Sequence, residues 1–239
     1  MYPTLVQLGP LAIDSYAVFG LLAFLVAWQV RKAELKRLGH RRMAGYSWVL
    51  VGALLGAVVG AKTGMFMFEP TLRLERMLSL DFSGKTVIGG LIGGYIGVEV
   101  AKKAVGITES TGDAFAVALP LAQAVGRVGC LLNGCCYGTG FDGPWAVTLA
   151  EASRHPTQIY ETLLLLGLAG FLWKHRLVPA PAGHLFRRYL VGYALIRFAL
   201  EFLRGDPSLT VGPLSVVQVV CLVAAGVFGW LIYRGERIR

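Results

Sequence analysis

Charged residues are scarce in this 239-residue chain: Asp, Glu, Lys and Arg make up only 15% of it, against about 25% in soluble domains. Hydrophobic residues reach 55%, and the mean hydropathy is +0.61. Residues 43–61 and 207–233 contain no charged residue, and roughly 20 apolar helical residues can cross a bilayer. This composition excludes a disordered chain and disfavours an ordinary soluble globule. It predicts an all-α, polytopic integral membrane protein.

A basic leader segment is also missing, because no Lys or Arg precedes Arg31. A cleaved signal peptide begins with such a segment, so we expect the first apolar stretch to stay as a membrane anchor. Hydropathy and turn residues predict about seven transmembrane helices in a single domain over residues 1–239. We expect these spans near residues 11–30, 44–67, 86–104, 113–132, 157–173, 186–203 and 214–233.

The net charge of +9 is unevenly placed, with six basic residues in 31–42. In a membrane protein such a cluster is typical of a cytoplasmic loop, so we expect no nucleic-acid partner. The same set of loops would hold 15 of the 23 Lys and Arg residues. This bias predicts an N-terminus outside and a C-terminus in the cytoplasm.

Glycines recur every four residues at Gly52, Gly56, Gly60 and Gly64, and five more lie in 89–97. Small residues at this interval let two helix backbones approach closely in a membrane. The pattern predicts tight helix packing. A narrow groove for acyl chains is compatible with the same pattern.

Ionisable side chains inside predicted spans are costly and therefore mark function. They are Asp14, Lys62, Glu99, Arg127, Glu161, Arg197, Glu201 and Arg204.

Arg197, Glu201 and Arg204 follow one another at spacings of four and three, which places them on one helix face. They form either a buried ion network between helices or, with one positive charge in excess, an anion site. In the second case Arg127 and Arg197 would clamp a phosphate, since guanidinium forks match phosphate oxygens.

The segment GRVGCLLNGCCYG (126–138) combines four glycines with Arg127 and Asn133. Glycines allow backbone amides to turn toward an anion, and the Asn133 amide can orient a lipid headgroup. Composition alone thus indicates a polar site at the end of the fourth predicted span.

The four cysteines, Cys130, Cys135, Cys136 and Cys221, form no CxxC pair and no zinc-like set with histidine. The adjacent Cys135 and Cys136 would not easily bind one metal, so we expect no metal and no cofactor. The first three cysteines remain open to three interpretations: structural residues, a disulfide of Cys130 with Cys135 or Cys136, or a reactive thiol.

The segment RHPTQIYE (154–161) precedes the fifth predicted span, with Pro156 suited to a first helical turn. His155, Tyr160 and Glu161 would then lie near the headgroups. They form either an interfacial cap with an aromatic anchor or a group that handles a proton or a headgroup hydroxyl.

Several motifs, in this order, resemble bacterial prolipoprotein diacylglyceryl transferase: GGLIGG (89–94), GRVGCLLNGCCYG, RHPTQIYE and RFALEFLRGDP (197–207). The resemblance covers nearly the whole chain. It implies a multi-pass protein of the bacterial cytoplasmic (inner) membrane. Such a protein moves a diacylglyceryl group from phosphatidylglycerol to a prolipoprotein cysteine, in lipoprotein biosynthesis.

The resemblance implies that Arg127 and Arg197 bind the phosphate and stabilise the leaving group. The expected substrate-binding residues are Tyr16, Gly89, Gly90, Asn133, Tyr160, Glu161, Tyr193, Glu201 and Arg204. Cations where negative charge develops are what such a reaction needs.

The chain departs from the family pattern at Ile88, Cys130 and Cys135, where the family has His or Tyr, Asn and an acidic residue. Because Ile88 accepts no proton, the expected base for the acceptor thiol is His155. A Cys135 or Cys136 thiolate is the alternative, as a covalent lipid carrier.

Three other functions stay open. The protein would act on another anionic phospholipid or another acceptor, or keep the fold as a non-catalytic lipid-binding or assembly protein, or transport a small anion.

Overall fold

Helices make up most of the computed structural model, which describes residues 2–8, 11–39, 45–64, 87–149, 151–205 and 210–237. The chain divides into two units. Unit 1 contains residues 1–39, 110–206 and 218–239, and unit 2 contains residues 40–109 and 207–217. The helices are α1 (Ser15–Arg37), α2 (Tyr46–Thr63), α4 (Val87–Ala104), α5 (Asp113–Ala116), α6 (Ala118–Asn133), α7 (Thr157–His175), α8 (His184–Glu201) and α9 (Val216–Arg237).

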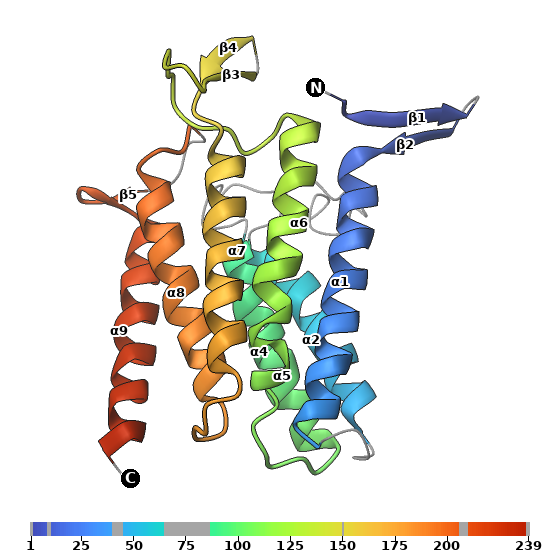
Figure 1. Cartoon of the computed structure of the whole chain (residues 1–239), viewed down its shortest axis with the longest axis vertical. Helices are drawn as coiled ribbons and strands as arrows, with labels where there is room; N and C mark the ends of the chain where they lie inside the picture. Colours follow the sequence, from blue (N-terminus) through green and yellow to red (C-terminus); the bar gives the residue numbers. More distant parts are fainter. Residues whose placement is uncertain are drawn as a thin grey trace. The chain divides into compact units, whose positions relative to one another are not determined.

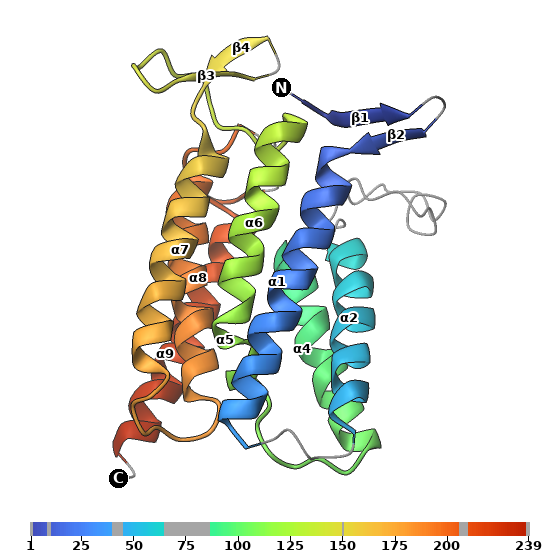
Figure 2. The ribbon, with the colours of Figure 1, turned by 45° about the vertical axis from the view of Figure 1, so that its right-hand side comes forward.

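In unit 1 the helices α1, α6, α7 and α8 lie side by side in that order (Figures 1 and 2). Strands β3 (Val147–Leu149) and β4 (Ala152–Arg154) pair as an antiparallel hairpin in the loop between α6 and α7. This loop lies beyond the end of α6 and the beginning of α7. It brings residues from both helices' ends together.

Side chains cap two of these helices where their first amides lack partners. The Asp14 carboxylate accepts a hydrogen bond from the Tyr16 amide and begins α1. The Asp113 carboxylate accepts hydrogen bonds from the Gly183 and Phe186 amides, at 2.7 and 2.9 Å, at the start of α8. Asp14 therefore acts as a helix cap, although it falls in a predicted span.

Each of the seven predicted segments overlaps a long helix of the described chain. The ends agree within about five residues except at α1, which continues to Arg37, seven residues past the predicted end. By length and composition, four helical segments in the described part are suited to cross a membrane: Ser15–Arg37, Tyr46–Thr63, Asp113–Asn133 and Val216–Gly235. Helices α4, α7 and α8 have 18, 19 and 18 residues, but charged side chains interrupt them.

Two parts of the prediction around the first helix are wrong. Leu11–Asp14 is strand β2, which pairs with β1 (Thr4–Leu8) instead of beginning the helix. The basic stretch 31–42 is not a loop throughout, because α1 continues to Arg37. The buried Glu34 carboxylate stabilises this extension by accepting hydrogen bonds from Arg37 at 2.7 Å and Arg176 at 2.8 Å. Residues 40–42 lie outside the described ones.

In unit 2, α2 and α4 pack antiparallel with their backbones in contact. Gly52 faces Gly97, Gly56 faces Gly93 and Gly60 faces Gly89. A Cβ atom added at any of these glycines except Gly89 would overlap backbone atoms of the partner helix. This confirms the close packing that the four-residue glycine interval predicts. Gly64 is buried at the end of α2.

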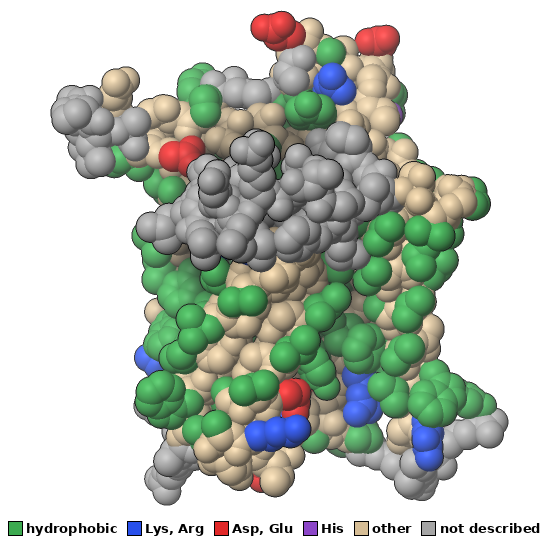
Figure 3. Space-filling model, turned by 180° about the vertical axis from the view of Figure 1, so that it is seen from behind, with side chains coloured by type: hydrophobic (Ala, Val, Ile, Leu, Met, Phe, Trp, Pro, Cys, Tyr) green, Lys and Arg blue, Asp and Glu red, His purple; other side chains and the backbone are tan. Residues whose placement is uncertain are grey.

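Large apolar side chains are exposed along the helices instead of being collected in a core. On α2 and α4 they are Trp48, Val51, Leu54, Leu55, Val58, Val59, Ile92, Tyr95, Ile96 and Val100. Figure 3 shows such side chains over the visible face, with charged side chains nearer its ends. A soluble monomer rarely exposes patches of this size, and lipid contact explains them.

Candidate functional site

A buried carboxylate lies between two arginines in unit 1. The Glu161 Oε1 atom on α7 is 2.9 Å from Arg127 Nη2 on α6, and Glu161 Oε2 is 3.9 Å from Arg197 Nη1 on α8. Arg197 Nη2 also donates to Glu201 Oε2 at 2.7 Å. Arg127, Glu161 and Arg197 are 8%, 3% and 6% exposed. Three neighbouring helices therefore bring their charges to one buried cluster.

The structure brings together the two predicted clamp residues, Arg127 and Arg197, but it places Glu161 between them. From the sequence, Glu161 was expected near the headgroups as a substrate contact, and its role between the arginines was not predicted. The sequence does hold one indication of this role, because Glu161 is the single acidic residue of the apolar helix α7. Such a charge at membrane depth requires partners.

Two buried donors of this cluster have no hydrogen-bond partner in the described part of the chain: Arg197 Nη1 and the Tyr193 hydroxyl. Tyr193 lies one helical turn before Arg197 on α8 and is 4% exposed. Leaving a buried donor unsatisfied costs about 1–3 kcal/mol. Adjacent unsatisfied donors therefore point to an acceptor that binds here.

Among the described residues, His155 contacts the loop above the helices and not this arginine cluster. Its ring stacks on Phe141 with centroids 4.0 Å apart, and its Nδ1 lies 3.2 Å from the Tyr160 hydroxyl. That hydroxyl also accepts a hydrogen bond from Trp145 at 2.7 Å. His155 and Tyr160 thus belong to an aromatic cap, as one of the two interpretations of this segment expected.

The end of α6 turns sharply and gathers three cysteines. Gly134 has a φ of 72°, its amide donates to Leu131, and the Cys135 amide donates to the Cys130 carbonyl. This is a Schellman motif, which glycine favours because its φ is positive. Cys136 follows with a φ of 61°, a conformation that few residues other than glycine adopt.

As a result, the sulfurs of Cys130, Cys135 and Cys136 all lie within 4.8 Å of one another. All three are free thiols. The expectation that the adjacent Cys135 and Cys136 would not easily face one metal ion is therefore wrong. The positive φ of Gly134 and that of Cys136 accompany this convergence, and the residue type at Cys136 does not favour the second.

Positive charge surrounds the last of these thiols. Hydrogen bonds from the neighbouring Cys130 and Cys135, together with the charges of Arg127 and Arg204, hold the pKa of the Cys136 thiol below its usual range. Arg204 follows α8, where its backbone bridges to Gly138 of the cysteine-containing loop. The predicted substrate residue Arg204 thus lies beside the thiols.

Other predicted site residues fall in three places. Tyr16 on α1 is within electrostatic range of Arg127 and the three thiols, and Asn133 lies near the Cys135 thiol. Gly89 and Gly90 lie on α4 in unit 2. Gly89 contacts Gly60 there, which is a packing role.

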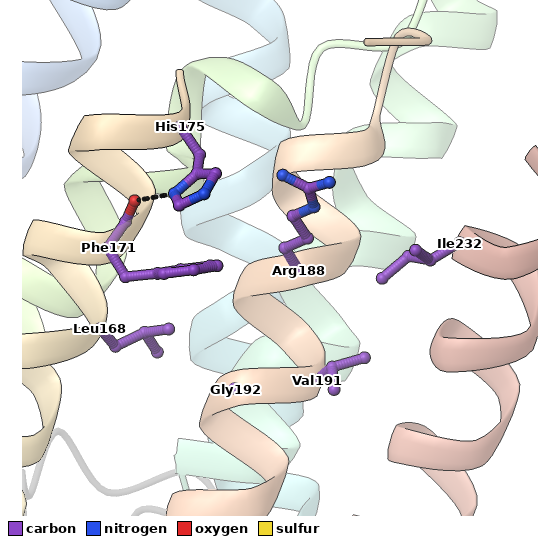
Figure 4. A pocket seen from close by; sticks show the side chains of 7 residues that line it. All are labelled: Leu168, Phe171, His175, Arg188, Val191, Gly192 and Ile232. Atoms are coloured by element: carbon purple, nitrogen blue, oxygen red, sulfur yellow. Dashed lines mark hydrogen bonds between the residues drawn. The ribbon is translucent and has the colours of Figure 1, made fainter. Parts of the chain in front are cut away.

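An open pocket of about 430 Å³ lies elsewhere in unit 1, between α7, α8 and α9 (Figure 4). Leu168, Phe171, Val191 and Ile232 form its apolar wall. His175 Nδ1 donates a hydrogen bond to the Phe171 carbonyl at 2.8 Å. Its Arg188 is nine residues from Arg197 on α8, about 13.5 Å along the helix axis. The pocket is therefore separate from the arginine cluster.

Long apolar helices around a buried arginine–carboxylate cluster define a helical membrane protein with an internal polar site. The chain belongs to the prolipoprotein diacylglyceryl transferase family, whose model matches residues 3–234. The prediction of this family is thus confirmed.

Three relatives named phosphatidylglycerol–prolipoprotein diacylglyceryl transferase illustrate the similarity. The Bordetella avium protein is 33% identical over 236 residues, which cover 92% of this chain and 89% of the relative. The Clostridium tetani protein is 29% identical over 249 residues, covering 100% and 99%. The Nitratidesulfovibrio vulgaris protein is 31% identical over 256 residues, covering 98% and 94%.

Proposed function

We propose that this protein transfers the diacylglyceryl group of phosphatidylglycerol to the cysteine thiol of a prolipoprotein. The relatives' names state these two substrates. The observation that carries the proposal is the pair of arginines on Glu161 with two unsatisfied donors, Arg197 Nη1 and the Tyr193 hydroxyl. A phosphate oxygen is the acceptor that suits these donors.

The reaction places its charge where the arginines lie. The acceptor sulfur bonds to the glyceryl carbon, the bond from that carbon to the phosphate oxygen breaks, and glycerol phosphate leaves. Negative charge grows on the departing phosphate, and fixed cations stabilise it. We assign this role to Arg127 and Arg197 as catalytic residues, while the Glu161 carboxylate positions both guanidinium groups.

The remaining predicted site residues are assigned to the phosphate, to its approach, to the cap or to the lipid chains. Tyr193 donates to the phosphate, Glu201 orients Arg197, and Arg204, Asn133 and Tyr16 line the approach near the cysteines. Tyr160 contributes to the cap. Gly89 and Gly90 stay proposed contacts of the lipid chains.

His155 is the proposed base for the acceptor thiol. Tyr160 occupies its Nδ1, and its other ring nitrogen is the one that we assign to the proton. The alternative, a Cys135 or Cys136 thiolate that carries the lipid covalently, predicts a lipid-modified enzyme.

We further propose a single multi-pass domain of the bacterial inner membrane with seven spans, an external N-terminus and a cytoplasmic C-terminus. The positive-inside bias of the loops supports this orientation. A reporter fused after Arg239 that is active only in the periplasm would overturn it.

The test is transfer in vitro. Purified protein is incubated with phosphatidylglycerol and a lipobox peptide, and the peptide's mass is measured. We expect addition of one diacylglyceryl group, and none with a peptide whose cysteine is replaced by serine.

One observation favours a second function, a lipid-binding protein without transfer activity. Ile88 stands at the start of α4, where the family pattern has a His or Tyr. Binding of phosphatidylglycerol without any transfer to the peptide would support this second function and refute the first.

A further inference from the structure

Three cysteine sulfurs converge at the end of α6, within 4.8 Å of one another. A tetrahedral zinc site has sulfurs about 3.8 Å apart, given a Zn–S distance of about 2.3 Å. Small side-chain rotations of Cys130, Cys135 and Cys136 close the difference. The family pattern has no such triad, because Asn and an acidic residue replace two of its members.

Side chains of α7 donate hydrogen bonds to the backbone of two of these cysteines. Gln158 Nε2 donates to the Cys135 carbonyl at 2.7 Å, and Thr157 Oγ1 donates to the Cys136 carbonyl at 2.9 Å. Both donors come from the first turn of α7 and are buried. Ligands fixed by such surrounding bonds are characteristic of protein metal sites.

The ligand set limits the ions that can bind and their coordination. Soft thiolates select zinc, copper(I) and iron–sulfur clusters. Three protein ligands leave the fourth position of a tetrahedral zinc ion open, as in catalytic zinc sites. Three thiolates and Zn²⁺ carry one net negative charge, and the charges of Arg127 and Arg204 act on this place.

We propose that Cys130, Cys135 and Cys136 bind a zinc ion, and that its open fourth position binds the thiolate of the acceptor cysteine. The role of the acceptor rests on the proposed function, whereas the metal site does not. Ile88 cannot accept the proton of the acceptor thiol, and the zinc ion would make this thiol nucleophilic instead.

The chemistry balances without any further reactant. A thiol that binds zinc is deprotonated, and its proton passes to water. The zinc-bound sulfur donates its electron pair to the glyceryl carbon. The carbon–oxygen bond to phosphate breaks, glycerol phosphate leaves with that bond's electrons, and the neutral thioether dissociates from the zinc.

The first experiment measures metal content and needs no activity. The reduced, full-length protein is purified without chelators or an affinity tag that binds metal, and its metals are quantified by mass spectrometry. We expect about one zinc per chain. Copper or iron in place of zinc, no metal after dialysis against zinc, or a disulfide among these cysteines would each overturn the site.

Variants test the ligands. Cys135→Ser or Cys136→Ser should lower zinc affinity more than about 100-fold, whereas Gln158→Ala should lower it by about 10–100-fold by loosening the loop. Cys221→Ser is the matched control, since Cys221 is also buried but lies on α9 outside the triad. Unchanged zinc content in Cys136→Ser would refute the triad.

The second experiment tests the open position. Cobalt(II) is substituted for zinc, and the sulfur-to-cobalt absorption is recorded with a lipobox peptide and with its serine counterpart. We expect only the cysteine peptide to change the spectrum. An unchanged spectrum would refute binding of the acceptor thiolate at the fourth position and leave the zinc ion a structural role only. Zinc and the spectral change without lipid transfer would refute the proposed function but not the metal site.

Discussion

The Glu161 carboxylate lies 2.9 Å from the Arg127 guanidinium in the interior of unit 1, and its second oxygen faces Arg197. Removing its charge leaves the buried Arg127 without its carboxylate partner and Arg197 with Glu201 alone. We expect Glu161→Gln to destabilise the protein by about 3–5 kcal/mol, measured by thermal unfolding in detergent.

The control for this change is Glu99→Gln on α4. Glu99 pairs with Lys102 at 3.0 Å, but its side chain is 40% exposed. Lys102 is buried but Glu99 is not, so the loss of this charge should cost less than the loss of Glu161, whose pair with Arg127 is buried on both sides. Equal effects of the two changes would contradict the importance of the buried cluster.

Replacing either clamp arginine should reduce transfer. We expect Arg127→Ala or Arg197→Ala to lower the rate by at least about 100-fold, as removal of one charge-stabilising donor does elsewhere. Lysine should restore the rate only in part, because it lacks the bidentate fork. Arg188→Lys, beside the separate pocket, serves as the control, and a fully active Arg197→Ala protein would remove the phosphate clamp.

Tyr189 and Tyr193 lie one turn apart on α8, and their substitution should distinguish an effect on stability from an effect on substrate binding. Tyr189 donates to Gln123 at 3.2 Å, whereas the Tyr193 hydroxyl has no partner among the described residues. Tyr189→Phe should therefore cost about 1 kcal/mol. Tyr193→Phe should leave the melting temperature unchanged or raise it, and should weaken binding of phosphatidylglycerol. Loss of stability in Tyr193→Phe, with normal lipid binding, would contradict the assignment.

Neighbouring glycines on α4 should respond differently to alanine. A Cβ at Gly93 overlaps the α2 backbone, but at Gly94 the nearest atom is 3.4 Å away, an ordinary contact. We expect Gly93→Ala to separate the helix pair and cost about 1–3 kcal/mol, with Gly94→Ala close to neutral. Denaturant titration of both variants would show this, and identical midpoints would exclude the close packing.

Gly134, which directly follows α6, should be far less replaceable than Gly126 within that helix. Gly134 has a φ of 72°, whereas Gly126 is helical with open space around it. Gly134→Ala should cost about 1–2 kcal/mol because alanine is strained there, while Gly126→Ala should be neutral or stabilising. The same pair should differ in zinc retention, which only the Gly134 change should lower.

The sequence could predict features that depend on one segment at a time. The seven helical segments, the glycine interval of α2 and the pairing of Arg197 with Glu201 all follow from spacing along a single helix. The strand at Leu11–Asp14 was missed because only Asp14 and Ser15 separate its apolar residues from those of α1.

Features that depend on two segments were beyond a single sequence. Spacing does not reveal that α7 lies between α6 and α8, and so it could not place Glu161 between Arg127 and Arg197. The convergence of the cysteines depends on the positive φ of Cys136, which its residue type does not favour.

The glycine contacts of α2 and α4 also bear on how the two helices find their alignment. Their glycines recur every four residues on both sides, so sliding one helix by four residues, about 6 Å, still places two of the three glycine pairs face to face. The glycine contacts alone therefore distinguish poorly between neighbouring alignments of the two helices. The larger side chains of Val105 and Ile107 lie close to Gly45 at one end of the pair. Because this contact occurs once among the described residues and does not repeat, it favours a single register.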